Sequence, residues 1–249
     1  MKVELLAHTQ LSQKTWGHLY DTNNGELFMH AISVETGEES HTPPTSGQVV
    51  SLAAIRQCYS HKTALEVLET ESEKYFGERG KEGKRLFKQI VTSGHTSTME
   101  HLNFTFTVEG VSRSLLAQLT RHRHMSFSVQ SQRYVKLSSE SRSGGFDYVV
   151  PEKVKEKAVT SLFNDTMEMI QGAYDALIAN GVPQEDARAV LPNAASCNLV
   201  LTANLRTLLD FYSKRKPGNG AQHEITVLAT KLREAVVEVE PWTDEFFEL

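Results

Sequence analysis

The chain has 249 residues, 39% of them hydrophobic, and its 26 Lys and Arg against 31 Asp and Glu give a net charge of -5. This length and composition can bury one sizeable core, so we expect a single domain over residues 1–249. The negative balance disfavours a general nucleic-acid or membrane binder. We find neither an apolar run of about 18 residues nor a signal-peptide pattern, which predicts a cytoplasmic protein.

The first hundred residues contain weak strand signals followed by strong helical ones. Residues 3–6 predict an opening strand, and the stretch 26–32 predicts a second one before a loop over 37–47. Apolar residues then recur at helical spacing from 48 to 91. Glycines at positions 77, 80 and 83 are expected to break this run into separate helices.

The clearest strand of the chain lies at its centre. Residues 102–109 alternate between apolar and polar side chains, which is typical of a half-buried strand. Gly110 is expected to end this strand. Ser112 can cap the helix that follows, which should end near Arg121.

The C-terminal half reads mainly as helices. We expect one long amphipathic helix over 152–180, a strand or a helix lead-in at 199–202, and helices from 204 to 212 and from 221 to 239. Residues 216–220 form a loop between the last two helices. Strands and helices are interleaved, which predicts an α+β or mixed α/β class.

Cysteine and histidine usage argues against a metal centre. Cys58 and Cys197 are far apart and lack a CxxC grouping, so we interpret both as small buried side chains. His95, Glu100 and His101 have the residue types of metal ligands. We favour no metal there, because His101 adjoins the strand and Glu100 can pair with an arginine.

A basic segment interrupts the acidic chain. Between Gly110 and Ser139 there are five Lys and Arg residues and no Asp or Glu. Guanidinium groups bind phosphate through two parallel hydrogen bonds, and Ser hydroxyls and loop N–H groups can fill the remaining acceptor sites. The segment therefore predicts a phosphate site, although an Arg-rich helix end that forms ion pairs with acidic residues elsewhere would have the same composition.

Four stretches of the chain follow one another in a distinctive order. The most specific is Arg121-His122-Arg123 followed by Ser131 and Arg133; the others lie within 93–101, 181–192 and 204–225. Together they resemble the motifs of flavin-dependent thymidylate synthases. The resemblance is firm over about residues 93–225. It implies an α+β fold with a mixed or antiparallel sheet flanked by helices, in a homotetramer whose active sites are shared between subunits.

The resemblance also implies a reaction. It is the reductive methylation of dUMP to dTMP, with 5,10-methylenetetrahydrofolate as the carbon donor and FAD, reduced by NADPH, as the hydride carrier. The partners would be dUMP and folate, with neither nucleic acid nor membrane among them. The Pro-Cys-Gln setting of thiolate-dependent thymidylate synthases is absent around both cysteines, which favours flavin chemistry without a cysteine nucleophile.

Site residues follow from the resemblance position by position. The cofactor-binding residues would be His95, Ser97, Arg121, His122, Arg123, Val129, Asn204, Arg206 and Asp210. The nucleotide-binding residues would be Gln118, Arg121, Val129, Ser131, Gln132, Arg133, Arg188 and Arg215.

The resemblance assigns catalysis to Arg215. The family's arginine at this position lies against the uracil ring, where a fixed cation lowers the pKa of N3 and makes C5 nucleophilic. Two positions depart from many relatives: Val129 stands in place of a Glu, and Asp210 in place of an Asn. Both departures concern contacts with FAD.

Two other classes of function remain open on the sequence. One is a non-catalytic nucleotide- or RNA-binding module, against which the net charge and the lack of interleaved aromatic residues argue. The other is a flavoprotein relative that lost thymidylate synthesis, which Val129 and Asp210 keep open.

Tyr134 and Trp242 are interpreted as packing residues.

Overall fold

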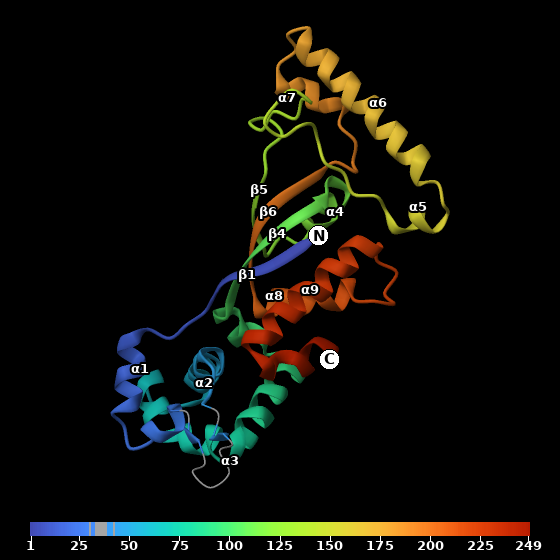
Figure 1. The fold of residues 1–249 in the computed structure, drawn as a ribbon. Helices are drawn as coiled ribbons and strands as arrows, with labels where there is room; N and C mark the ends of the chain where they lie inside the picture. Colours follow the sequence, from blue (N-terminus) through green and yellow to red (C-terminus); the bar gives the residue numbers. More distant parts are fainter. Residues whose placement is uncertain (30, 33–38, 42) are drawn as a thin grey trace. The chain divides into compact units, whose positions relative to one another are not determined.

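The computed structural model describes residues 1–29, 31–32, 39–41 and 43–249. Its main feature is a four-stranded antiparallel sheet with strand order β1-β4-β6-β5 (Figure 1). The strands are β1 (Lys2–His8), β4 (Asn103–Ser112), β5 (Ser126–Val129) and β6 (Ser196–Asn204). The alternation predicted for β4 is present, since Phe104, Phe106 and Val108 are buried. The remaining short strands, β2 (Ala31–Ile32) and β3 (Glu39–His41), pair with each other.

The helices account for most of the rest of the described chain. The α-helices are α1 (Gln13–Tyr20), α2 (Ser46–Tyr59), α3 (Ala64–Thr92), α4 (Arg113–Leu119), α5 (Glu152–Glu156), α6 (Thr160–Ala179), α7 (Gln184–Ala187), α8 (Leu205–Arg215) and α9 (His223–Val239). The 3-10 helices are η1 (Gly25–Phe28), η2 (Thr96–His101), η3 (Arg188–Val190) and η4 (Pro241–Glu248). Within the described residues, no helix combines the length and apolar character needed to cross a bilayer.

The chain forms two compact units, each assembled from segments distant in sequence. The first unit comprises Met1–Leu6, Thr105–Thr202 and Lys214–Leu232. The second comprises Ala7–Phe104, Ala203–Ser213 and Arg233–Leu249. The expectation of a single domain over all 249 residues stays a prediction.

Helix capping explains where the long helices of the second unit begin. Thr45 precedes α2 and Thr63 precedes α3, and each forms a capping box with the residue three positions on, Gln48 or Glu66. The two helices then pack through fully buried side chains such as Ile55, which belongs to α2. Capping and packing therefore fix the positions of α2 and α3 within the second unit.

In the first unit, hydrogen bonds fix the end of β4 to the start of α9. Glu224 accepts two of them, from the Ser112 backbone N–H at 2.8 Å and from the Ser112 hydroxyl at 2.6 Å. The Ser112 hydroxyl in turn accepts from Leu115 N–H at 3.0 Å, which is the predicted N-cap of α4. The start of α4, and hence the Arg-rich segment after it, is anchored by this contact.

Several predicted element boundaries are wrong in the N-terminal half. Residues 25–28 form the helix η1 instead of a strand, and of the described residues in the predicted strand, Ala31–Ile32 belong to one. Strand β3 lies within the predicted loop 37–47, of which residues 37, 38 and 42 lie outside the described part of the chain. Helix α3 is continuous through its three glycines, although Gly80 has a positive φ of 70°. A Cβ at Gly83 would lie 2.6 Å from the Tyr75 carbonyl oxygen, so this glycine permits a close backbone approach.

Two further boundaries differ around the sheet. Gly110 does not end β4, which continues to Ser112 with Gly110 at a φ of 67°. The predicted helix over 152–180 is two helices, α5 and α6, separated at Ala158. Ala158 has a φ of 55°, in the left-handed region, which a continuous α-helix does not allow.

The two cysteines differ in environment. Cys58 is exposed at the end of α2, so the expectation that it is buried is wrong. Cys197 is buried in β6, and burial raises the pKa of its thiol. Trp242 is confirmed as a packing residue, since its ring centroid lies 4.7 Å from that of Phe87.

The buried carboxylate of Glu240 joins the C-terminal segment to the start of α2. It accepts hydrogen bonds from Gly47 N–H at 3.0 Å, from Trp242 Nε1 at 2.6 Å and from the Thr45 hydroxyl. Glu240 is 1% exposed, and burial raises its pKa above the ordinary value of 4.5 despite these donors. The folded protein thus binds this proton more tightly than the unfolded chain does.

Replacing Glu240 should change how stability depends on pH. Because the folded-state pKa is raised, the contribution of Glu240 is fully present below its unfolded pKa and is lost as pH rises through the folded value. We expect the free energy of unfolding of the wild type to fall relative to that of Glu240→Gln as pH rises from about 4 to 7. Urea unfolding across this range measures the difference.

Glu238→Gln is the matched control, because Glu238 is an exposed carboxylate two residues before Glu240, at the end of α9. Its unfolding curve should follow that of the wild type over the whole pH range. A difference between the free energies of unfolding of the wild type and of Glu240→Gln that is independent of pH across this range would contradict the raised pKa of Glu240.

Candidate functional site

The segment Arg121-His122-Arg123, here called the Arg-rich turn, lies in the first unit, between α4 and β5. Helix α4 ends as Arg121 N–H donates to Gln118 O at 3.4 Å and His122 N–H donates to Leu119 O at 3.0 Å. On the other side of the turn, β5 is held by antiparallel pairing with β6. Arg121 and Arg123 are both exposed. Within the residues that the structure describes, neither guanidinium forms an ion pair with a carboxylate.

His122, between these two arginines, contacts Arg215. The Arg215 Nε donates to His122 Nε2 over 3.3 Å in a partly buried position. An accepting Nε2 carries no proton, so this contact requires a neutral imidazole. The end of α8 is thereby brought onto the turn, and the predicted catalytic arginine lies beside a predicted cofactor residue.

The loop after β5 is organised by short-range hydrogen bonds. Ser131 Oγ accepts from Arg133 N–H at 3.2 Å, and the Gln184 side-chain amide donates to the Arg133 carbonyl. Gln130 N–H donates to Asn198 O at 2.9 Å, which ties the start of the loop to β6. The predicted nucleotide-binding residues of this loop therefore have a defined backbone position.

Glu185 is a residue of this site that sequence reasoning missed. Its Oε2 accepts from Arg133 Nη2 at 3.2 Å and from Arg133 Nε at 3.4 Å. Its backbone carbonyl accepts from Arg188 Nε at 3.0 Å. Two predicted phosphate-binding arginines thus meet at one residue of α7, and for Arg133 the ion-pair interpretation of the basic segment is correct. The signal in the sequence that could have identified Glu185 is its position, three residues before the predicted site residue Arg188.

The Arg133–Glu185 pair is accessible to solvent. Both side chains are 52% exposed, and a pair of this kind contributes at most about 1 kcal/mol. The carboxylate occupies only the Nε and Nη2 edge of the guanidinium. A stronger anion such as phosphate could therefore replace it at small cost.

Three neighbouring residues have different surroundings. The side-chain amide nitrogen of Gln132 is buried without a hydrogen-bond partner in the described structure, which is costly unless a ligand satisfies it. Gln118 Nε2 donates to Ser114 O at 3.4 Å, and Val129 pairs with Leu199 in the ladder. Tyr134 is not a packing residue as predicted: it is 79% exposed, with the Arg133 guanidinium 5.7 Å from its ring centroid.

The remaining predicted cofactor residues lie in the second unit. His95 caps η2 and Ser97 lies within that helix. Arg206 Nη1 lies 2.5 Å from Glu100 Oε1, which confirms that Glu100 pairs with an arginine. Asn204 Oδ1 accepts from Thr207 N–H at 2.9 Å, so its side chain caps α8.

A cavity adjoins this second group. It has a volume of about 610 Å³, and its lining includes Thr96, Arg206 and Asp210 together with the C-terminal residues Phe246 and Phe247. The lining thus combines polar and charged residues with aromatic ones. Such a lining suits a ligand that carries both a planar ring and polar groups.

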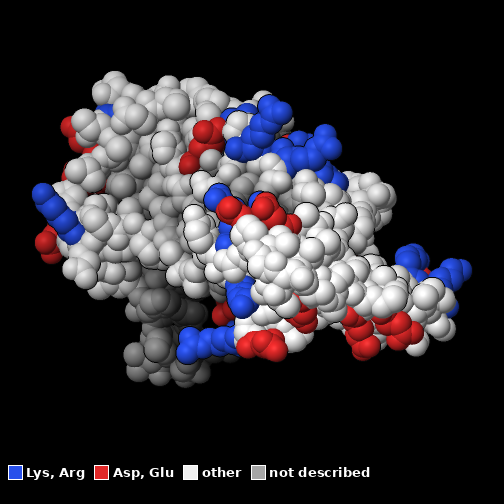
Figure 2. Space-filling view, turned by 90° about the horizontal axis from the view of Figure 1, so that it is seen from above, with Lys and Arg blue, Asp and Glu red and all other residues white. Residues whose placement is uncertain are grey.

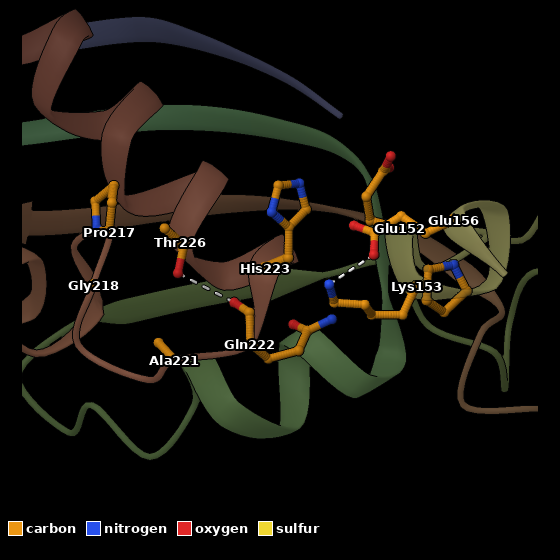
Figure 3. A pocket seen from close by; sticks show the side chains of 10 residues that line it. Glu152, Lys153, Glu156, Pro217, Gly218, Ala221, Gln222, His223 and Thr226 are labelled. Atoms are coloured by element: carbon orange, nitrogen blue, oxygen red, sulfur yellow. Dashed lines mark hydrogen bonds and ion pairs between the residues drawn. The ribbon is translucent and has the colours of Figure 1, made fainter.

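Another cavity, of about 550 Å³, lies at the start of α9 in the first unit (Figure 3). Gln222 and His223 line it opposite α5, whose Lys153 forms an ion pair with Glu156 at 2.7 Å. None of the predicted site residues lines this cavity. On the face shown in Figure 2, Lys and Arg form separate groups among Asp and Glu, so the positive charge is local and not general.

Comparison with known proteins identifies the family. Residues 40–242 match the family model described as thymidylate synthase complementing protein. The flavin-dependent thymidylate synthase of Geobacter sulfurreducens is 40% identical over 203 residues, which is 81% of each chain. That of Clostridium tetani is 36% identical over 215 residues, 80% of each chain.

Solved structures share the fold. The UMP/dUMP methylase PolB from Streptomyces cacaoi, bound with 5-Br dUMP, aligns with a TM-score of 0.68 and 21% identity, over 99% of this chain and 94% of its own. ThyX from Helicobacter pylori, complexed with FAD and dUMP, aligns with a TM-score of 0.60 and 23% identity, over 100% and 98%.

The structural matches define the class as an α+β fold built on a four-stranded antiparallel sheet. The family model and the curated relatives are more specific. They show that the chain belongs to the flavin-dependent thymidylate synthase family.

The contact between Glu185 and Arg133 yields a prediction about anion binding. In Glu185→Gln, Arg133 loses a competing carboxylate, so inorganic phosphate should bind about two- to fivefold more tightly, in keeping with a weak exposed pair. Isothermal titration calorimetry at fixed ionic strength measures the affinity.

The control is Glu156→Gln, which removes the same charge from an exposed ion pair in the same unit. Phosphate affinity should be unchanged in this variant. Weaker phosphate binding by Glu185→Gln would contradict the competition and would mean that the carboxylate orients Arg133 for the anion.

Proposed function

We propose that the chain catalyses the reductive methylation of dUMP to dTMP, with 5,10-methylenetetrahydrofolate as the carbon donor and FAD, reduced by NADPH, as the hydride carrier. One observation carries the proposal for this family member: Arg121 and Arg123 present exposed guanidinium groups without a carboxylate partner in the described part of the chain. The relative from Helicobacter pylori was crystallised with FAD and dUMP, two phosphorylated ligands.

The nucleotide phosphate would bind to arginines of the first unit. Arg121, Arg133 and Arg188 supply forked N–H donors, and Ser131 adds a hydroxyl. Three guanidinium groups balance a phosphate dianion, and Glu185 would release Arg133 as the phosphate arrives. The unpartnered amide nitrogen of Gln132 fits a further acceptor of the nucleotide.

Arg215 would act on the uracil ring. Its Nε is used by the bond to His122, which leaves both Nη groups to face an acceptor. A cation held beside N3 lowers the pKa of that position, and the ionised pyrimidine is more nucleophilic at C5. The proposed reaction uses no thiolate, which agrees with a buried Cys197 whose thiol pKa is raised.

The Arg-rich turn of the first unit would bind the pyrophosphate of FAD. Arg121, His122 and Arg123 offer donors to the pyrophosphate. We also propose contacts with FAD for Val129 in the first unit and, in the second unit, for His95, Ser97, Asn204, Arg206 and Asp210. The polar and aromatic lining of the cavity beside Arg206 fits a flavin cofactor. When bound, FAD supplies the hydride that converts the methylene group to methyl.

We extend the proposal to a homotetramer in which several chains share each active site. The support is electrostatic: the exposed guanidinium groups of Arg121 and Arg123 find no counter-charge within the described part of their own chain. A bound ligand or a neighbouring chain would supply that charge. Family membership favours this enzyme over a non-catalytic RNA-binding module.

Flavin spectroscopy tests the proposal. The purified protein should be yellow, or become so with added FAD, and dUMP should perturb the flavin spectrum. With folate donor and NADPH, it should form dTMP only in the presence of FAD. A colourless protein that does not respond to FAD would overturn the proposal.

The variant Arg215→Ala separates cofactor binding from chemistry. We expect it to retain FAD but to form dTMP at least about a hundredfold more slowly, because it lacks the cation that stabilises charge on the pyrimidine. Rates of dTMP formation and flavin content are both measured. Arg142→Ala, which removes an exposed arginine outside the predicted site, should behave as the wild type. Full turnover by Arg215→Ala would exclude the role given to Arg215.

A further inference from the structure

A hydrogen bond joins His95 to a residue that no motif assigned. The Tyr59 hydroxyl lies 2.7 Å from His95 Nδ1. The two rings also meet edge to face, with centroids 5.8 Å apart and an interplanar angle of 84°. Tyr59 is the last residue of α2, and His95 caps η2, so both belong to the second unit.

Contacts other than the Tyr59–His95 hydrogen bond fix the backbones that carry these two side chains. Helix α2 is held at its start by the Thr45–Gln48 capping box and along its length by buried residues such as Ile55. Helix η2 is anchored by the fully buried Met99. What these contacts leave undetermined is the rotation of the His95 imidazole, and the Tyr59 hydroxyl restricts that rotation.

With the Tyr59 hydroxyl as the donor, the bond selects a tautomer. A phenol O–H can donate to an unprotonated Nδ1. In a neutral imidazole the proton then resides on Nε2. His95 would present an N–H donor, in a fixed direction, on the side of the ring away from Tyr59.

We infer that Tyr59 is a positioning residue for His95: its hydroxyl donates to Nδ1, fixes the ring and its tautomer, and leaves Nε2–H to bind the flavin or folate ring system. This rests on the proposed function for the identity of the ligand. Tyr59 itself is 61% exposed, so its packing contributes little to the fold. The hydroxyl is therefore the feature to be tested.

The test is Tyr59→Phe, which keeps the ring and removes only the hydroxyl. In the ligand-free protein labelled with ¹⁵N-histidine, NMR at pH 8 should show Nδ1 of His95 unprotonated and Nε2 protonated in the wild type. In Tyr59→Phe the ¹⁵N chemical shifts of the two nitrogens should move towards each other, because both tautomers become populated. A His95→Gln spectrum assigns the signals.

Activity provides the second readout. The turnover number for dTMP should fall about two- to tenfold in Tyr59→Phe, as expected for one hydrogen bond, with KM for dUMP unchanged. In a His95→Gln background, Tyr59→Phe should have no further effect. Tyr20→Phe, an exposed tyrosine of the same unit, is the control and should leave both readouts unchanged.

The two readouts separate the inference from the proposed function. Nδ1 protonated in the wild type, or His95 signals unaffected by Tyr59→Phe, would overturn the role of Tyr59. If the wild-type protein forms no dTMP, the proposed function fails, while the NMR result still decides whether Tyr59 sets the tautomer of His95.

Discussion

The proposed function depends on one electrostatic constraint: the Arg-rich turn must hold its guanidinium groups in place without carboxylate partners in the described part of the chain. Arg121 and Arg123 lie two residues apart on one turn, in a chain whose net charge is -5. Like charges at this separation repel each other, so the turn needs a frame that holds it in place. The Ser112–Glu224 contact anchors the start of α4, and pairing with β6 anchors β5. These contacts of the flanking elements set the position of the turn.

The arginines of the site differ in how they are held, and the differences suggest a division of labour. Arg133 is held by the weak, exposed pair with Glu185, which an incoming dianion can replace. Arg215 is held through Nε by a neutral imidazole, which leaves its charge intact. Arg206 is paired with Glu100 in the second unit. The group with the least internal compensation, the Arg-rich turn, is the one that a phosphorylated ligand would neutralise.

Local patterns in the sequence were sufficient for part of this architecture. The alternation in residues 102–109 predicted β4, and the capping residue Ser112 predicted the start of α4, because each depends only on near neighbours. The continuity of α3 through its glycines could not be predicted from near neighbours in the sequence. A glycine costs only about 1 kcal/mol in a helix, and packing of residues such as Phe87 outweighs it. The break at Ala158 carries no glycine or proline to mark it.

The same distinction applies to the candidate site. Its motif residues could be named from the sequence because they recur in fixed order in one family. Glu185 and Tyr59 could not, since their partners lie 52 and 36 residues away and no local periodicity relates them. Tyr134 was misjudged for a related reason: an aromatic side chain predicts burial on average, but here it is exposed beside a guanidinium group.

A crystal structure of the protein with FAD and dUMP bound tests the central claim most directly. The account predicts that the guanidinium groups of the Arg-rich turn contact the pyrophosphate of FAD, and that Arg133 has left Glu185 for the phosphate of the nucleotide. If that turn faces open solvent, or is neutralised by carboxylates with no space for either ligand, the account is wrong.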